Sequence, residues 1–167
     1  MSTRSLAFGG VISALSSLFI IASTLFHLIT PLVVACILFY VCARKCGSLC
    51  AVLVIFVSNL IGFAVGGIGA GEILFSVLIF SPYSIIVFLT SRLDSAPALV
   101  ALRAVIFAAF SLAVYILFIT ALSSVTSAFG GFGLGVKTLG VLFVAAMTAF
   151  GFALEKGTAI IFKRFLK

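Results

Sequence analysis

The chain has 167 residues, of which 65% are apolar and only 8% are charged, whereas about 25% of the residues of an average soluble domain are charged. So few charges cannot give a folded chain a polar surface, which excludes a soluble enzyme, a disordered regulator and a nucleic-acid-binding domain. The net charge of +7 is spread as separate basic residues between long apolar runs, so the composition predicts a multi-pass membrane protein rather than a basic nucleic-acid surface.

Charged residues and turn signals divide the chain into six apolar runs, each near the roughly 20 residues that cross a bilayer core of about 30 Å. We predict an all-α, single-domain protein (residues 1–167) with transmembrane helices at about 5–26, 29–43, 48–66, 73–91, 104–122 and 137–155. The runs are apolar on every face, which favours helices over the alternating strands of a membrane barrel. The first run is longer than the core of a signal peptide, so we expect it to be retained as a helix.

The Lys and Arg residues predict the orientation of these helices. With the N-terminus in the cytoplasm, nine basic residues lie inside and only Lys137 lies outside. This asymmetry supports an even number of spans, so we expect both termini in the cytoplasm and a multi-pass protein of the cell (plasma) membrane. Residues 156–167 are expected to form a basic interfacial tail that anchors on the lipid bilayer, with a specific lipid or protein site as the alternative.

Glycine-rich segments precede two of the predicted helices without matching a nucleotide-binding motif. In the run at residues 130–138, a single residue separates Gly135 from Lys137 and no strand precedes the loop, so it is not a phosphate loop. The run at residues 66–71 lacks the spacing of a dinucleotide fingerprint. Both are interpreted as external loops, or alternatively as gates over a pocket. No carboxylate pair or nucleophile–base set is visible, so we expect no enzyme activity and no cofactor.

Four cysteines lie around the second predicted turn, at Cys36, Cys42, Cys46 and Cys50. The last three are four residues apart and would share a face on one helix, but Gly47 and the turn interrupt it. Zinc sites usually need four ligands, and thiols at a cytoplasmic helix end stay reduced. Free buried or interfacial thiols are therefore favoured and no metal site is predicted, although a metal or redox role remains the alternative.

Placing a polar side chain inside a bilayer is unfavourable in free energy, so each such residue is expected to have a structural or functional role. Asn59, Glu72, Tyr83 and Tyr115 are all expected in the outer half of the membrane, where they would bound a mostly apolar substrate-binding pocket if the bundle closes. The alternative is helix–helix hydrogen bonding for Asn59 and interfacial placement for the other three. His27, the only histidine, is interpreted as an interfacial polar residue or a ligand contact.

The first predicted helix carries small residues at helical spacing. Gly10 and Ala14 share one face, while Gly9, Ser13 and Ser17 lie on an adjoining face. Small residues four apart let helix backbones approach closely. The two readings are packing within the bundle and a docking face for another protein.

The opening run from Thr3 to Leu15 and the six-span plan resemble the S components of energy-coupling-factor (ECF) transporters, and Phe80-Ser81-Pro82-Tyr83 is similar to uncharacterised bacterial relatives. The resemblance implies a six-helix substrate-binding subunit that works with a transmembrane coupling subunit and ABC-type ATPases. Members dock through an Ala-xxx-Ala motif on the first helix. Gly10 and Ala14 occupy the matching positions here, with Gly in place of one Ala.

The resemblance implies a membrane subunit that binds a small-molecule ligand, a rather apolar nutrient, although no vitamin-specific motif is recognisable. The alternative is a structural or assembly membrane protein of the MreD-like type, which acts through protein contacts alone. A stand-alone carrier is disfavoured, because no acidic residue lies near a helix centre.

Overall fold

The computed structural model describes residues 3–66, 71–92, 97–121 and 136–165, and these are helical apart from short turns, with no strand among them. Five helical segments are long and apolar enough to cross a membrane, by length and composition: Thr3–Phe26, Ser48–Gly66, Glu72–Thr90, Pro97–Leu117 and Thr138–Gly157. The all-helical membrane-protein class predicted from composition is therefore confirmed. The contacts of the chain group into two compact units, residues 1–92 and 93–167, which are described separately.

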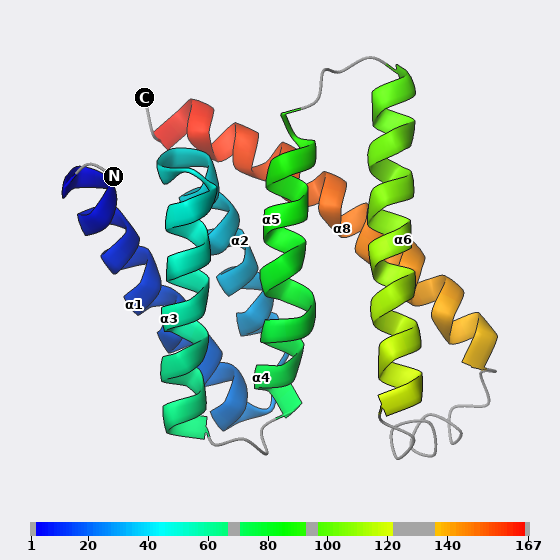
Figure 1. The fold of residues 1–167 in the computed structure, drawn as a ribbon, viewed down its shortest axis with the longest axis horizontal. Coiled ribbons are helices and arrows are strands. Elements are labelled where there is room, and N and C mark those ends of the chain that lie inside the picture. The colour runs from blue at the N-terminus through cyan, green and yellow to red at the C-terminus, as the bar shows by residue number, and fades with distance from the viewer. Residues whose placement is uncertain (1–2, 67–70, 93–96, 122–135, 166–167) are drawn as a thin grey trace. The chain divides into compact units, whose positions relative to one another are not determined.

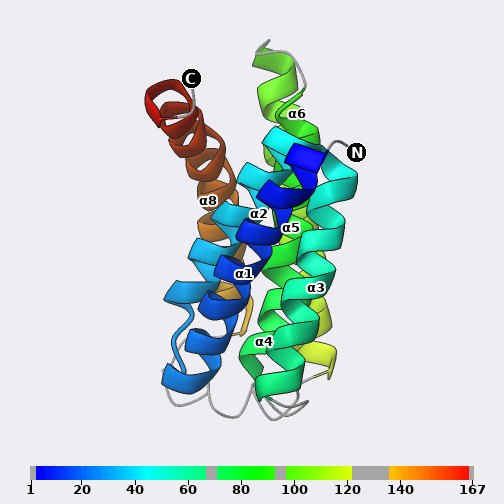
Figure 2. The same cartoon turned by 90° about the vertical axis from the view of Figure 1, so that its left-hand side faces the viewer.

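The first unit contains α1 (Thr3–Phe26), α2 (Thr30–Cys46), α3 (Ser48–Gly66) and a composite helix. The composite helix consists of α4 (Gly71–Phe75), the π-helical segment η1 (Ser76–Phe80) and α5 (Ser81–Thr90). Helix α1 packs along both α2 and α3, and α2 also packs against α5 (Figures 1 and 2). Short turns make successive helices antiparallel, so the start of α1, the end of α2, the start of α3 and the end of α5 lie at one end of the unit.

Helix α2 begins with Pro31 in its first turn, where the missing N–H has no helical partner to lose. It ends with Arg44 and Lys45 in its last turn, three residues beyond the predicted end at residue 43. Basic residues suit this position because the carboxyl end of a helix carries a partial negative charge. With 17 residues, α2 is about 25 Å long and is the shortest of the predicted spans.

The composite helix passes through Pro82 without ending. Pro82 cannot donate a backbone hydrogen bond, and the turn before it widens so that the Ser81 N–H donates to the carbonyl of Ser76, five residues earlier. π-Helical turns of this kind are rare and are often found at functional sites.

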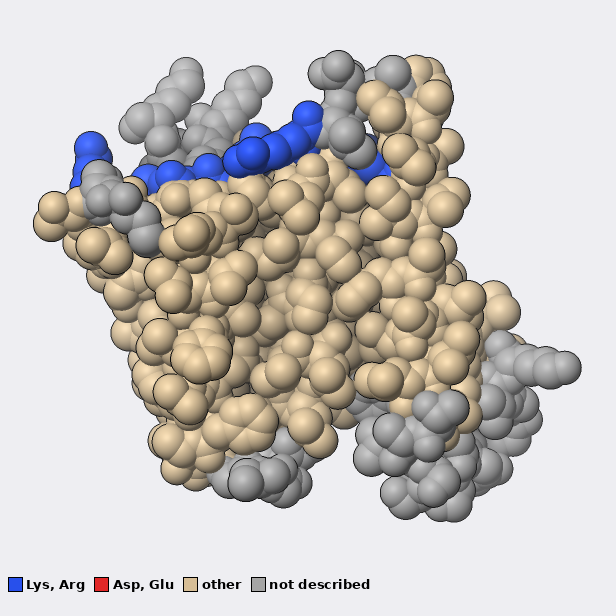
Figure 3. All heavy atoms as spheres, viewed as in Figure 1, with Lys and Arg blue, Asp and Glu red and all other residues tan. Residues whose placement is uncertain are grey.

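The first unit exposes many large apolar side chains and also buries several hydroxyl groups in its interior. Large apolar side chains such as Phe56 and Leu25 are about two-thirds exposed, at 65% and 68%, while Ser58 and Ser76 are fully buried. Lys and Arg side chains gather at one end of this unit, with uncharged surface below them (Figure 3). A lipid environment explains an apolar outer surface together with buried hydroxyl groups that bond across helices.

Close helix contacts in the first unit depend on small residues. A Cβ atom added at Gly9 would lie 3.0 Å from the Cys50 sulfur, and one added at Gly62 would lie 2.7 Å from Cγ2 of Ile20. Gly9 and Gly62 thus bring α1 and α3 together near opposite ends of their contact. The face of α1 that carries Gly9, Ser13 and Ser17 is therefore used for packing within the unit.

The second unit contains α6 (Pro97–Ala121) and α8 (Val136–Phe165), which pack against each other. Helix α6 begins seven residues before the predicted start at residue 104, so Arg103 lies inside the helix and not in the preceding loop. Helix α8 continues well beyond residue 155, so the predicted tail is helical as far as Phe165. The glycine-rich run at residues 130–135 and most of the run at 66–71 lie outside the described residues.

Candidate functional site

Asn59 on α3 lies in the interior of the first unit, where it joins α3 to the composite helix. Its Nδ2 atom donates to Ser81 Oγ at 3.1 Å and to the Ile55 carbonyl at 2.9 Å, and its Oδ1 atom accepts from Ser76 Oγ at 2.7 Å. Only 6% of Asn59 is exposed. Every polar atom of the amide therefore has a partner within the unit. This agrees with the alternative interpretation of Asn59, in which it forms hydrogen bonds between helices.

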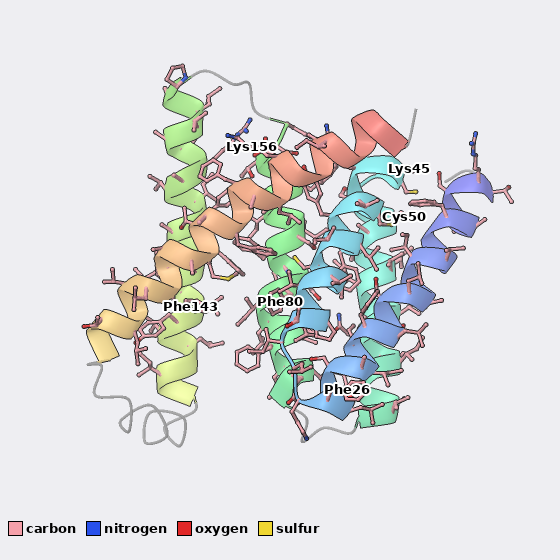
Figure 4. The ribbon with its side chains drawn as sticks, turned by 180° about the vertical axis from the view of Figure 1, so that it is seen from behind. Phe26, Lys45, Cys50, Phe80, Phe143 and Lys156 are labelled. Carbon is pink, nitrogen blue, oxygen red and sulfur yellow. The ribbon has the colours of Figure 1, made fainter. Side chains whose placement is uncertain are left out.

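Neighbouring side chains satisfy carbonyl groups around the π-helical segment. Ser84 Oγ donates to the carbonyl of Ser81 at 2.7 Å, and the Cys36 thiol of α2 donates to the carbonyl of Phe80 at 3.3 Å. Phe80 lies midway along the composite helix (Figure 4). Tyr83, one turn further on, is completely buried. The Ser81–Pro82–Tyr83 segment thus faces the interior of the unit.

A second polar contact lies between the α1–α2 turn and α4. His27 adopts a left-handed backbone conformation with φ 51°, and its Nδ1 atom lies 2.9 Å from Oε1 of Glu72. The Glu72 side chain is largely buried while that of His27 is 80% exposed. This contact joins the α1–α2 turn to α4, at the end of the unit that the charge bias predicts to be external.

Tyr115 belongs to the second unit. Its ring packs on Gly140, where an added Cβ atom would lie 2.5 Å from Cε1, and its centroid is 6.0 Å from that of Phe143. In the same unit Arg103 Nη1 and Glu155 Oε1 form an ion pair at 2.7 Å. This ion pair joins α6 to the facing helix α8.

The four predicted binding residues thus have separate surroundings. Asn59 and Tyr83 lie in the interior of the first unit, Glu72 lies at its end beside His27, and Tyr115 packs within the second unit. Their role in binding a substrate stays a prediction. The hydrogen bonds of Ser76 and Ser81 were not predicted, although hydroxyl groups within an apolar run were a visible signal for bonding across helices.

The small residues of α1 separate into two faces. Gly10 and Ala14 are exposed, and nothing lies within 4 Å of a Cβ atom added at Gly10. Gly9, Ser13 and Ser17 are buried, and Ser13 and Ser58 join α1 to α3 through hydroxyl groups 3.2 Å apart. Gly10 and Ala14 therefore lie on an exposed face of α1, as a docking face requires, while docking itself stays a prediction.

All four cysteines are free thiols. Cys42, Cys46 and Cys50 nevertheless converge, with sulfur atoms all within 4.8 Å of one another. Gly47 does interrupt the helix, as expected, but the turn is short enough to place Cys50 beside the other two. Cys36 lies apart, against the π-helical segment.

Comparison with known proteins assigns no family: no family model matches the chain, and no curated protein or solved structure is similar enough to show a relationship. Function is therefore inferred from the helices and side chains described above.

Proposed function

We propose that this chain is the membrane-embedded substrate-binding subunit of an ECF-type uptake transporter for a small nutrient, with no ATPase activity of its own. It would lie in the cell membrane with six spans and both termini in the cytoplasm. A transmembrane coupling subunit and ABC-type ATPases would supply the energy for uptake.

Support for six spans comes from the five long apolar helices together with α2. Helix α2 falls a few ångströms short of a hydrocarbon core of about 30 Å, and Arg44 and Lys45 at its end can extend their charged groups to the interface. With α2 as a span, nine of the ten basic residues lie on one side of the membrane.

Topology can be tested by labelling single introduced cysteines with a membrane-impermeant maleimide in intact cells. Positions 127 and 95 lie outside the described residues, in segments predicted to be external and cytoplasmic respectively. A cysteine replacing Ser127 should react and one replacing Ser95 should not. The reverse pattern would refute the topology and the transporter role with it.

The observation that carries the proposal is the exposed face of α1. Gly10 and Ala14 lie one turn apart on it, both are exposed, and nothing lies within 4 Å of a Cβ atom added at Gly10. Small side chains allow a second helix backbone to approach, and dispersion then contributes much of the attraction in lipid. This is the position at which the resemblance to S components places the docking motif.

The proposed ligand contacts within the first unit are Asn59, Glu72 and Tyr83. Glu72 and His27 would lie at the external entrance, where the exposed imidazole is accessible to a solute. The interior positions would offer a mostly apolar wall with few polar groups, which suits a rather apolar nutrient.

The deciding experiment is affinity purification of the chain from its native membrane. We expect a coupling subunit and ATPases to copurify, and native mass spectrometry to detect a bound small molecule. Ala14→Trp should abolish copurification, whereas the matched control Leu25→Trp, at a position 68% exposed near the other end of α1, should retain it. Equal recovery with both variants would refute docking through this face.

A structural or assembly role of the MreD-like type is the second candidate. It is favoured by the Asn59 amide, whose hydrogen-bonding groups are all paired within the unit rather than directed at a ligand. Copurification with cell-wall machinery, and no bound small molecule, would support this role against the first.

A further inference from the structure

Three cysteine side chains form a cluster at the turn between α2 and α3. The sulfur atoms of Cys42, Cys46 and Cys50 lie within 4.8 Å of one another, and those of Cys42 and Cys50 are 4.0 Å apart. Figure 4 shows Cys50 and Lys45 at the same end of the first unit, opposite Phe26. The charge bias predicts that this end faces the cytoplasm.

The backbone at Gly47 brings these cysteines together. Cys42 and Cys46 share one face of α2, four residues apart, and Gly47 is the single residue between α2 and α3. Its φ of 91° lies in a region that residues with side chains rarely adopt. This sharp reversal places Cys50, in the first turn of α3, against the last turn of α2.

The cluster combines buried and accessible sulfur atoms. Cys42 and Cys50 are buried, while Cys46 is partly exposed and offers a path from solvent. Three thiolates this close would repel one another in a poorly solvated site, so a bound cation is needed to hold them together in the charged form. Arg44 lies in the same last turn, and Lys45 stacks over Phe8 with 4.4 Å from Nζ to the ring centroid.

The spacing of the sulfur atoms fits a metal ion. A metal–thiolate bond of about 2.3 Å, the length found for zinc, places the three sulfur atoms of a planar trigonal site about 4.0 Å apart. The Cys42–Cys50 separation already has this value, and Cys46 needs only a small shift. A disulfide requires sulfur atoms only about 2.05 Å apart, so it would demand a larger movement.

The type and number of ligands select the metal. Thiolates favour soft ions such as Cu(I) and also bind zinc, but structural zinc sites almost always use four ligands. Within the part of the chain that the structure describes, no His, Asp or Glu joins the three cysteines. We propose that Cys42, Cys46 and Cys50 bind one Cu(I) ion in a trigonal thiolate site at the turn between α2 and α3.

Binding would form three Cu–S bonds and release the three thiol protons to solvent. The copper stays Cu(I) and the sulfur atoms are not oxidised. The site then carries two negative charges, at the end of α2 that contains the basic residues Arg44 and Lys45. This proposal does not depend on the transporter role, because it rests on the sulfur geometry alone.

The test uses the purified full-length protein in detergent under an inert atmosphere with a non-thiol reductant. Cu(I) is titrated in competition with a chromogenic Cu(I) chelator, and we expect one ion per chain. X-ray absorption on the wild-type complex should show three sulfur atoms at about 2.3 Å from copper. Copper bound by nitrogen or oxygen would overturn the proposal without any variant.

Serine variants assign the ligands. Cys50→Ser should weaken Cu(I) binding by about 100-fold or more, since even the loss of a group that only orients a ligand costs about 10–100-fold. The matched control Cys36→Ser removes a buried thiol outside the cluster and should bind like the wild type. Equal binding by Cys50→Ser and wild type, or preferential retention of Zn(II) when both ions are supplied, would refute a Cu(I) site.

Discussion

Asn59 provides a direct test of how the interior of the first unit is held together. Asn59→Ala removes two hydrogen bonds to the composite helix, through Ser76 and Ser81, and one to its own helix. It leaves the fully buried hydroxyl of Ser76 without its acceptor. The variant should therefore lose contacts between α3 and the composite helix while both helices remain intact.

The magnitude follows from the environment of these bonds. Hydrogen bonds between membrane helices contribute about 0.6 kcal/mol on average, so two of them account for about 1.2 kcal/mol. An unpaired buried hydroxyl costs about 1–3 kcal/mol, although Ser76 can reduce this by bonding within its own helix. We expect a destabilisation of about 2 kcal/mol, or about a 30-fold change in the ratio of folded to unfolded protein.

Reversible unfolding in mixed micelles of mild detergent and dodecyl sulfate, followed by circular dichroism, measures this difference. Ser84→Ala is the matched control, because it also removes a buried hydroxyl but one that bonds to Ser81 of its own helix, and it should destabilise the protein less than Asn59→Ala does. A double-mutant cycle with Ser76→Ala should return a coupling near 0.6 kcal/mol. An Asn59→Ala protein as stable as the wild type would refute the bonding described for this amide.

Two further predictions concern packing and charge. Gly62→Ala should destabilise the first unit by about 1–3 kcal/mol through overpacking, because the added Cβ atom meets Ile20 at 2.7 Å; Gly10→Ala, which meets nothing within 4 Å, should leave the unfolding midpoint nearly unchanged. In the second unit, Arg103→Met removes the ion pair to Glu155 and should be more destabilising than the Arg103→Met/Glu155→Met double variant. Equal stability of Gly62→Ala and Gly10→Ala would contradict the close contact between Gly62 and Ile20. A double variant less stable than Arg103→Met would contradict the role given to the ion pair.

The positions of the helices were largely readable from the sequence, because apolar runs bounded by turn signals leave few alternatives in lipid. The range predicted for α3, residues 48–66, is the observed one. Arg103 was misplaced because a charged residue was taken as a helix boundary. A positive charge can lie inside a helix when a carboxylate on the facing helix pairs with it, and a single apolar run does not reveal that partner.

Contacts across helices were harder to predict. The sequence showed that Asn59, a polar residue within an apolar run, needs a hydrogen-bonding or binding partner. Its actual partners depend on the π-helical turn that orients Ser76 and Ser81. Similarly, the spacing of Cys42, Cys46 and Cys50 was visible, while their convergence depends on the backbone of one glycine.

Composition and hydropathy determined that this is an all-helical membrane protein and where most of its helices lie, because the cost of burying unpaired backbone groups in lipid acts on every segment separately. Which face of each helix packs is decided by the neighbouring helices. Only the tertiary structure therefore separated exposed Gly10 and Ala14 from buried Gly9 and Ser13. The hydrophobic pattern cannot distinguish these faces, since lipid and protein interior are both apolar.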